Sequence, residues 1–223
     1  MRNGSLKANE TVQWTVSSDE RPKRKRRAAS AVLCLALAGC AHSSGQPAAR
    51  VAEPAIAAAY RALHGRVHLG IDPAEGAAVV IAPGIAVTNQ HNDEMVDARL
   101  VIGAAAQSDL LFFRVQTSAA PPRAQPVVGG RVTAYGQGAD AELRIAHGTV
   151  HDIATEAGFA IARWFTFEGD AGPGFSGGPV VDRQGRLVGI TFAYKDEGAK
   201  RLIYAYDMAR VQAELDNLSA ARR

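Results

Sequence analysis

Short apolar runs, each bounded by glycine, proline, aspartate or asparagine, recur from about residue 66 to residue 193. A run of about four to eight apolar residues between turn-forming residues is typical of a β-strand and too short for most helices. Many such strands at close spacing predict an all-β domain, built as a sandwich or as barrels. The expected strands are Arg66–Ile71, Ala77–Ile81, Ile85–Asn89, Leu100–Ile102, Leu110–Gln116, Arg131–Tyr135, Leu143–Ile153, Phe159–Phe165, Gly178–Val181 and Leu187–Ala193.

Two segments outside these runs have helical patterns. Glu53–His64 is rich in alanine and has Pro54 where the first turn of a helix tolerates proline, so a short helix is expected there. Tyr206–Leu218 carries apolar side chains at helical spacing, which predicts an amphipathic C-terminal helix. We expect the acids and arginines of this second helix to form a solvated face.

Positive charge is concentrated at the beginning of the chain. Residues 1–40 hold eight lysines and arginines against three acids, whereas the rest of the chain holds 17 against 19. The net charge of +3 therefore describes the first segment and gives no reason to expect nucleic-acid binding. The basic stretch Arg21–Arg27 precedes the short apolar stretch Ala28–Ala38, an order typical of a secretory signal peptide. A membrane-spanning helix would need about 20 apolar residues.

The end of this segment, Leu37–Cys40 (LAGC), resembles the lipobox of bacterial lipoproteins. The resemblance implies that Cys40 becomes the first mature residue and carries a lipid anchor. Ala41 after it resembles the sorting pattern for the outer membrane, with the protein facing the periplasm. The alternative is an ordinary cleaved signal peptide with an incidental cysteine. Because Cys34 would leave with the signal, the mature domain is expected to hold its fold without a disulfide.

These features divide the chain into four parts. Residues 1–20 are an upstream extension that a start assigned too early would explain, and residues 21–40 are the lipoprotein signal peptide. Residues 41–54 are rich in serine, glycine, glutamine, proline and alanine, which predicts a flexible tether. Residues 55–223 form the globular domain, and the apolar fraction of the chain, 47%, is enough to fill its core.

The glycine-rich segment Pro173–Pro179 (PGFSGGP) carries the strongest chemical signal. A nucleophilic serine has to present its hydroxyl on a tight turn, and glycines let backbone N–H groups gather around it as an oxyanion hole. Ser176 is therefore the candidate nucleophile, with Gly174 and Ser176 as the candidate N–H donors. The segment also fits the G-x-S-x-G turn of α/β-hydrolases, but that fold needs its histidine after the serine. The last histidine here is His151.

Two segments upstream supply a candidate base and acid. His91 ends an apolar run that begins at Gly84, and an imidazole titrates in the range that a general base needs near neutral pH. Asp109 directly precedes the apolar run Leu110–Val115, which would anchor the acid at the edge of a buried strand, where it can orient the imidazole. The predicted catalytic residues thus occur in the order histidine, aspartate, serine.

The three segments together resemble those of chymotrypsin-like serine peptidases, most closely the bacterial HtrA-like branch. In that branch Pro-Gly-x-Ser-Gly-Gly-Pro is followed by a strand, a turn and Val-Gly-Ile, as in residues 173–190 here, and Thr-Asn-x precedes the histidine, as at His91. The similarity runs from about Ala57 to the C-terminus. It implies two six-stranded-type antiparallel β-barrels and a C-terminal helix. Asp109 follows His91 by only 18 positions, so the first barrel is expected to be shortened.

The sequence departs from the family pattern at several places. Asn92 stands after the histidine, where an apolar residue is usual. Phe175 stands where trypsin-like zymogens carry an aspartate that pairs with a newly freed N-terminus, so activation by N-terminal cleavage is not expected. The chain ends at Arg223, so the PDZ domain typical of the HtrA-like branch is not expected either.

The resemblance implies a serine endopeptidase that hydrolyses proteins or peptides of the cell envelope through an acyl-enzyme, without a cofactor. The alternative is a catalytically inactive peptidase-fold binding module tethered to the membrane, because a fold does not guarantee chemistry. A metal site is not expected, since the pairs His64/His68 and His147/His151 lack the glutamate of an H-E-x-x-H motif. The sequence does not indicate an oligomeric state.

Two hypotheses on specificity stay open. Asp170 precedes Ser176 by six positions, the offset at which trypsin-like peptidases place the carboxylate at the floor of the primary pocket, and this implies a preference for arginine or lysine. HtrA-like enzymes instead prefer small apolar residues. In either case Thr191 and Phe192 are expected to form a wall of the pocket.

Overall fold

The computed structural model describes residues 44–65, 75–117, 120–138, 141–155 and 163–222. The predicted signal peptide, Cys40 and the expected strand Arg66–Ile71 lie outside these residues. None of the described helices is both long and apolar enough to cross a membrane.

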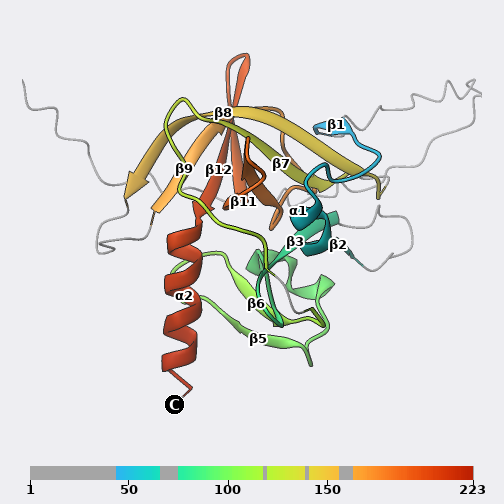
Figure 1. The fold of residues 1–223 in the computed structure, drawn as a ribbon, viewed down its shortest axis with the longest axis vertical. Coiled ribbons are helices and arrows are strands. Elements are labelled where there is room, and N and C mark those ends of the chain that lie inside the picture. The colour runs from blue at the N-terminus through green and yellow to red at the C-terminus, as the bar shows by residue number, and fades with distance from the viewer. Residues whose placement is uncertain (1–43, 66–74, 118–119, 139–140, 156–162, 223) are drawn as a thin grey trace, which may run out of the picture. The chain divides into compact units, whose positions relative to one another are not determined.

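Six strands of the C-terminal half form a closed antiparallel barrel, here called the second barrel (Figure 1). The strands follow one another in the order β8-β7-β10-β11-β12-β9, and β9 pairs back with β8. Large apolar side chains, among them Phe165, Phe167, Phe175 and Ile203, fill the interior of the barrel and are fully buried. The strands are β7 (Arg131–Gln137), β8 (Leu143–Thr155), β9 (Arg163–Glu168), β10 (Pro179–Asp182), β11 (Leu187–Glu197) and β12 (Lys200–Asp207).

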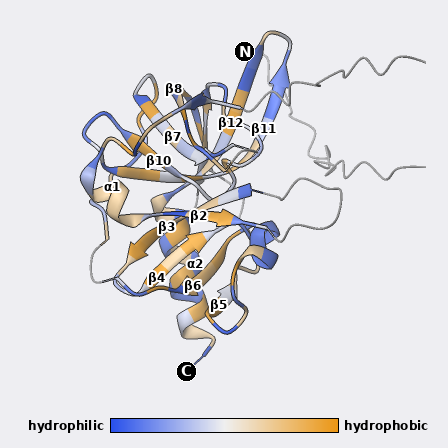
Figure 2. Cartoon of the chain, turned by 90° about the vertical axis from the view of Figure 1, so that its right-hand side faces the viewer, coloured by the Kyte–Doolittle hydropathy of each residue, from blue (hydrophilic) through white to orange (hydrophobic). Residues whose placement is uncertain are grey.

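The N-terminal half forms a five-stranded antiparallel sheet, here called the first sheet, in the order β2-β3-β4-β6-β5. No pairing between the described strands closes it into a barrel, which agrees with the shortening predicted from the spacing of His91 and Asp109. Figure 2 shows that β3, β4 and β6 are largely apolar, as expected for strands that supply a core. The strands are β2 (Tyr60–His64), β3 (Glu75–Ala82), β4 (Ile85–Thr88), β5 (Val101–Ala104) and β6 (Leu111–Arg114).

The C-terminal helix is confirmed as α2 (Met208–Ala220). The side chain of Asp207 caps its first turn by accepting a hydrogen bond from the backbone N–H of Arg210, 2.8 Å away. The expectation that its charged residues are all solvated is wrong, because Arg210 and Glu214 are 1% and 3% exposed. Their side of the helix faces the loop between β5 and β6, which covers it.

The helix expected over Glu53–His64 is only half as long. Helix α1 spans Pro54–Ala59, and Tyr60–His64 is instead strand β2, which pairs with β3 over all five of its residues. A short isolated helix is marginal in water, so the hydrogen bonds to β3 and the burial of Leu63 outweigh the helical tendency of the local sequence.

The segment before α1, expected to be part of a flexible tether, belongs to the domain from Ser44 onward. The short strand β1 (Gln46–Pro47) pairs with β8, and the backbone N–H of Gly45 donates to the backbone oxygen of Asp170, 3.0 Å away. Val51 is buried as well. Composition indicates a tether here, but the unpaired edge of a neighbouring strand gives these residues hydrogen-bond partners.

Candidate active site

His91 and Asp109, predicted as base and acid, lie against each other. His91 is in the 3-10 helix η1 (Gln90–Met95), one residue after β4, and Asp109 lies near the end of the loop between β5 and β6. The imidazole Nδ1 is 2.6 Å from Oδ2 of the aspartate, and the backbone N–H of His91 donates to Oδ1 at 3.1 Å. With the proton on Nδ1, the other ring nitrogen is left as an acceptor, which is the state a general base needs.

The two side chains differ in their exposure to solvent. The carboxylate of Asp109 is 16% exposed, whereas the imidazole of His91 is 44% exposed. The backbone of Asp109 is held from two sides: its oxygen accepts from Nδ2 of Asn89 at 2.8 Å, and its N–H donates to the hydroxyl of Tyr206 at 3.1 Å. The acid is thus fixed, while the imidazole stays accessible to a substrate.

Ser176 lies on a tight turn after β9, built from consecutive hydrogen-bonded bends. The N–H of Phe175 donates to the oxygen of Gly172, and the N–H of Gly178 donates to the oxygen of Phe175. Gly174 and Gly177 adopt positive φ angles of 85° and 79°, which L side chains rarely adopt. The glycines of the motif therefore have the conformational role that the sequence predicted.

The turn is joined to the first sheet beside His91. The backbone oxygen of Ser176 accepts from the N–H of Ala77 at 2.9 Å and from Nδ2 of Asn92 at 3.0 Å. The Asn92 amide also donates to Oγ1 of Thr88 at 2.9 Å and is 2% exposed. Because Asn92 follows His91 directly, it links the backbone of the candidate nucleophile to that of the candidate base. No hydrogen bond between the described residues joins Ser176 Oγ to His91.

Sequence reasoning missed this role of Asn92 and noted only that the residue is unusual. The signal was present, since a polar side chain stands where an apolar one is usual, at the position next to the predicted base His91. A buried amide needs hydrogen-bond partners, so such a replacement predicts a local polar contact but does not identify its partner.

Two N–H groups of the serine turn have no hydrogen-bond acceptor among the described residues. Within the described parts of the chain, the N–H groups of Gly174 and Ser176 make no hydrogen bond, whereas those of Phe175, Gly177 and Gly178 do. The two N–H groups without a protein acceptor are those that the sequence predicted as donors to a developing oxyanion.

The three predicted specificity residues lie in different environments. Asp170 is exposed on its loop, and its backbone oxygen accepts the hydrogen bond from the N-terminal segment. Thr191 is buried, and its backbone pairs with Gly177 and Gly178 next to the serine. Phe192 stacks on Tyr206, with ring centroids 4.0 Å apart and planes 16° apart.

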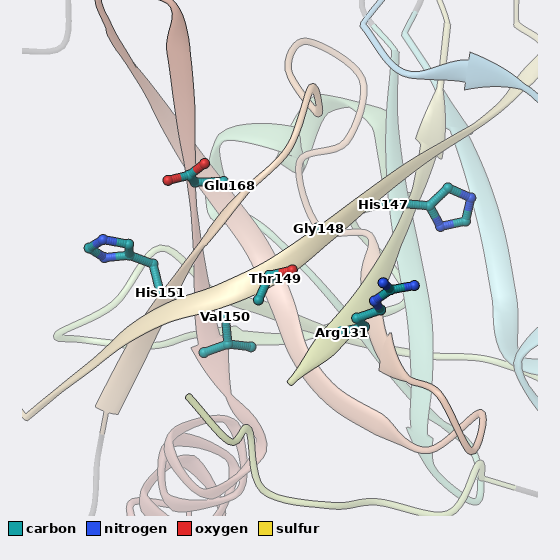
Figure 3. Close-up of a pocket in the computed structure, with 7 residues that line it drawn as sticks. All are labelled: Arg131, His147, Gly148, Thr149, Val150, His151 and Glu168. Carbon is teal, nitrogen blue, oxygen red and sulfur yellow. The ribbon is translucent and has the colours of Figure 1, made fainter. Parts of the chain in front are cut away.

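A separate hollow of about 600 Å³ lies on β7, β8 and β9, and it contains none of the predicted catalytic residues. Figure 3 shows that His147 and His151, which line it, point apart on opposite sides of Thr149. At the edge of this hollow, Nζ of Lys200 lies 2.6 Å from Oε1 of Glu168. This contact holds the pKa of the Glu168 carboxyl below its usual range. No group of three or more metal-ligating side chains is found among the described residues, and His68 lies outside them.

The trypsin-like peptidase domain family matches residues 71–190, a segment that contains His91, Asp109 and Ser176. This segment is more than half of the chain, and the chain therefore belongs to that family. A comparison with curated proteins finds no match.

Solved structures of serine proteases share the fold. The HtrA-type protease AlgW, solved with a tripeptide, is 19% identical with a TM-score of 0.56, over 72% of this chain and 59% of that chain. The Rv3671c protease of M. tuberculosis in its active form is 17% identical with a TM-score of 0.60, over 72% and 81% of the two chains. The serine endoprotease of Yersinia pestis is 21% identical with a TM-score of 0.58, over 75% and 65%. The chain thus spans about three fifths of the AlgW chain, and the likeness at these identities establishes the chymotrypsin-like fold.

Proposed function

We propose that the protein is a serine endopeptidase that hydrolyses peptide bonds through His91, Asp109 and Ser176. The observation that carries the proposal is the 2.6 Å contact between His91 and Asp109, on a segment that Asn92 joins to the serine turn. Peptide substrates are supported by the AlgW structure, which contains a tripeptide.

In the proposed mechanism, Ser176 Oγ attacks the carbonyl carbon of the scissile bond and transfers its proton to Nε2 of His91. Asp109 accepts the hydrogen bond from Nδ1 and stabilises the imidazolium that forms. The N–H groups of Gly174 and Ser176 donate to the oxyanion of the tetrahedral intermediate, and each such donor is worth about 3–4 kcal/mol. His91 then protonates the leaving amine, which leaves the acyl-enzyme. In the second half of the reaction His91 accepts a proton from water as the water attacks the acyl carbon, and it returns this proton to Ser176 Oγ as the acid product leaves.

The second candidate function is a catalytically inactive binding module with a peptidase fold. The observation that favours it is that no described hydrogen bond joins Ser176 Oγ to His91. Such bonds are often long in enzymes without substrate and tighten only in the complex. The same observation is therefore compatible with an active enzyme, and a test of reactivity is needed to separate the two.

Labelling with a fluorophosphonate probe tests activity, because the probe reacts only with an activated serine beside a formed oxyanion hole. We expect stoichiometric labelling of the protein and none of Ser176→Ala. Turnover of casein should fall by about 10⁶ in Ser176→Ala or His91→Ala and by about 10⁴ in Asp109→Asn. Full proteolysis by Ser176→Ala would rule out the mechanism, and a folded protein that neither labels nor cleaves casein would favour the binding module.

We also propose that the enzyme is anchored by a lipid on Cys40 and faces the periplasm, so that its substrates are proteins of the cell envelope. The support is the order of basic segment, apolar segment and lipobox in residues 21–40. Acylation at more than one site anchors a protein firmly, whereas a single chain anchors it only marginally. Mass spectrometry of the mature N-terminus, with Cys40→Ser as the control, should find an acylated Cys40. An unmodified terminus at Ala41 or His42 would indicate a soluble periplasmic enzyme instead.

A further inference from the structure

We infer that Tyr206, Arg210 and Glu214, at the junction of β12 and α2, are positioning residues that hold the Asp109 loop in its catalytic geometry. The inference rests on the proposed role of Asp109 as the acid of the triad. None of the three side chains belongs to the sequence motifs of the active site, and two of them lie on the helix face that the sequence led us to expect in solvent.

The junction contacts three consecutive residues of the loop. The Nη2 group of Arg210 donates to the backbone oxygen of Gln107 at 2.6 Å, and the hydroxyl of Ser108 donates to Oε1 of Glu214 at 3.2 Å. In the third contact, the backbone N–H of Asp109 donates a hydrogen bond to the hydroxyl of Tyr206 at 3.1 Å. The loop that ends in the acid is thus held residue by residue from the C-terminal end of the chain.

The contacts come from side chains that are themselves held in place. The side chains of Arg210 and Glu214 are both buried, and Nε of Arg210 lies 3.0 Å from Oε1 of Glu214. The capping hydrogen bond that the Asp207 carboxylate accepts from the N–H of Arg210 fixes the helical turn on which Arg210 lies, and the ring of Tyr206 is stacked on Phe192. A group held by such surroundings can set the position of a neighbour to within a fraction of an ångström.

The energetics of the ion pair agree with a positioning role. A buried ion pair is weak evidence for stability, because apolar residues of similar volume often replace it without loss. What apolar residues cannot replace are the two directional hydrogen bonds to Gln107 and Ser108. The geometry of Asp109 relative to His91 matters for the rate, since a misplacement of about 1 Å can cost about 100-fold in turnover.

The inference predicts that these residues act only through Asp109, which a double-mutant cycle can measure. Tyr206→Phe removes one hydroxyl and keeps the stacked ring, so it is the mildest variant. The pair of changes Arg210→Met and Glu214→Leu removes both charges of the ion pair together. The readout is the turnover of an activated ester, divided by the amount of reactive serine that the fluorophosphonate titrates to completion. This normalisation prevents a smaller folded fraction from being counted as a slower enzyme.

We expect Tyr206→Phe to lower turnover about tenfold at unchanged KM, as for the loss of one positioning hydrogen bond. In the Asp109→Asn background the same change should have almost no effect. The matched control is Arg123→Met, because Arg123 also joins α2 to the first sheet, through Gln212 and the backbone oxygen of Ile81, without contacting the Asp109 loop. It should leave turnover per titrated serine unchanged.

An equal loss in both backgrounds, or no loss in the wild-type background, would overturn the inference. If the charge-replaced pair fails to fold, Tyr206→Phe and Ser108→Ala still test it. A failure of the proposed function would be recognised separately, because Asp109→Asn alone would then leave turnover unchanged.

Discussion

Gly45→Ala should show that the N-terminal segment supports the active site. Gly45 has a φ of 73°, and a Cβ atom built on it would lie 2.6 Å from Cζ of Phe175 and 2.8 Å from the backbone oxygen of Ile145. Phe175 is fully buried and immediately precedes Ser176. The added methyl group therefore has to displace either the ring of Phe175 beside Ser176 or strand β8.

The expected loss of stability has two sources. An alanine in the left-handed region costs about 1–2 kcal/mol, and overpacking a buried site costs about 1–3 kcal/mol more. The free energy of unfolding should thus fall by about 2–5 kcal/mol. Gly198→Ala is the matched control, because Gly198 has a φ of 64° and nothing within 4 Å of its Cβ position. Gly198→Ala should therefore lower the free energy of unfolding only by the about 1–2 kcal/mol of the left-handed conformation.

Urea denaturation measures the stability difference, and the rate of fluorophosphonate labelling of the folded protein measures the effect on the serine turn. We expect slower labelling for Gly45→Ala and an unchanged rate for Gly198→Ala. Phe175→Leu should be less costly in the Gly45→Ala background than in the wild type, since the smaller side chain makes room for the methyl group. Equal losses of stability in both glycine variants, together with equal labelling rates, would refute the reasoning.

Three further predictions concern single side chains. Asn92→Leu should lower the free energy of unfolding by about 2 kcal/mol in urea titrations, because Thr88 and the carbonyl of Ser176 each lose a hydrogen bond; an unchanged midpoint would contradict the link. Burial raises the pKa of Tyr60 from 10.0 to about 12, so the folded state retains this proton where the unfolded state loses it. Loss of the Tyr60 proton should therefore lower the free energy of unfolding as the pH rises from about 10 to about 12, by about 2 kcal/mol at about pH 12, and Tyr60→Phe should show a correspondingly smaller fall. An equal fall in Tyr60→Phe would exclude this assignment. A peptide-library digest should show cleavage after small apolar residues, unchanged in Asp170→Ser, since Asp170 is exposed; a preference for arginine or lysine that this variant abolishes would instead establish a carboxylate pocket.

Sequence patterns predicted the parts of the fold whose cause is local. The alternation of short apolar runs and turn residues predicted β3 to β8, β10, β11 and the beginning of β9, but it did not predict β12. The glycines around Ser176 predicted its turn. The spacing of His91 and Asp109, compared with that of HtrA-like enzymes, predicted a shortened first barrel, and no pairing between the described strands closes the first sheet.

What the sequence could not predict depends on partners distant in the chain. Tyr60–His64 has a helical composition, and its pairing with β3 is a tertiary effect. Arg210 and Glu214 have the spacing of an ordinary surface ion pair on a helix, and only the position of the Asp109 loop buries them. The contacts of Gly45 likewise become apparent only when Phe175 is placed beside it.

The pairing of β1 with β8 limits how far the peptidase can extend from a membrane. If Cys40 carries the lipid, only five residue steps separate it from Gly45, whose backbone N–H is hydrogen-bonded to Asp170, and these reach at most about 18 Å. A free tether as far as Pro54 would have reached about 48 Å. The enzyme would then work within about one domain diameter of the lipid headgroups, on chains that emerge from the bilayer or are presented at its surface, and proteins diffusing farther out in the periplasm would be beyond its reach.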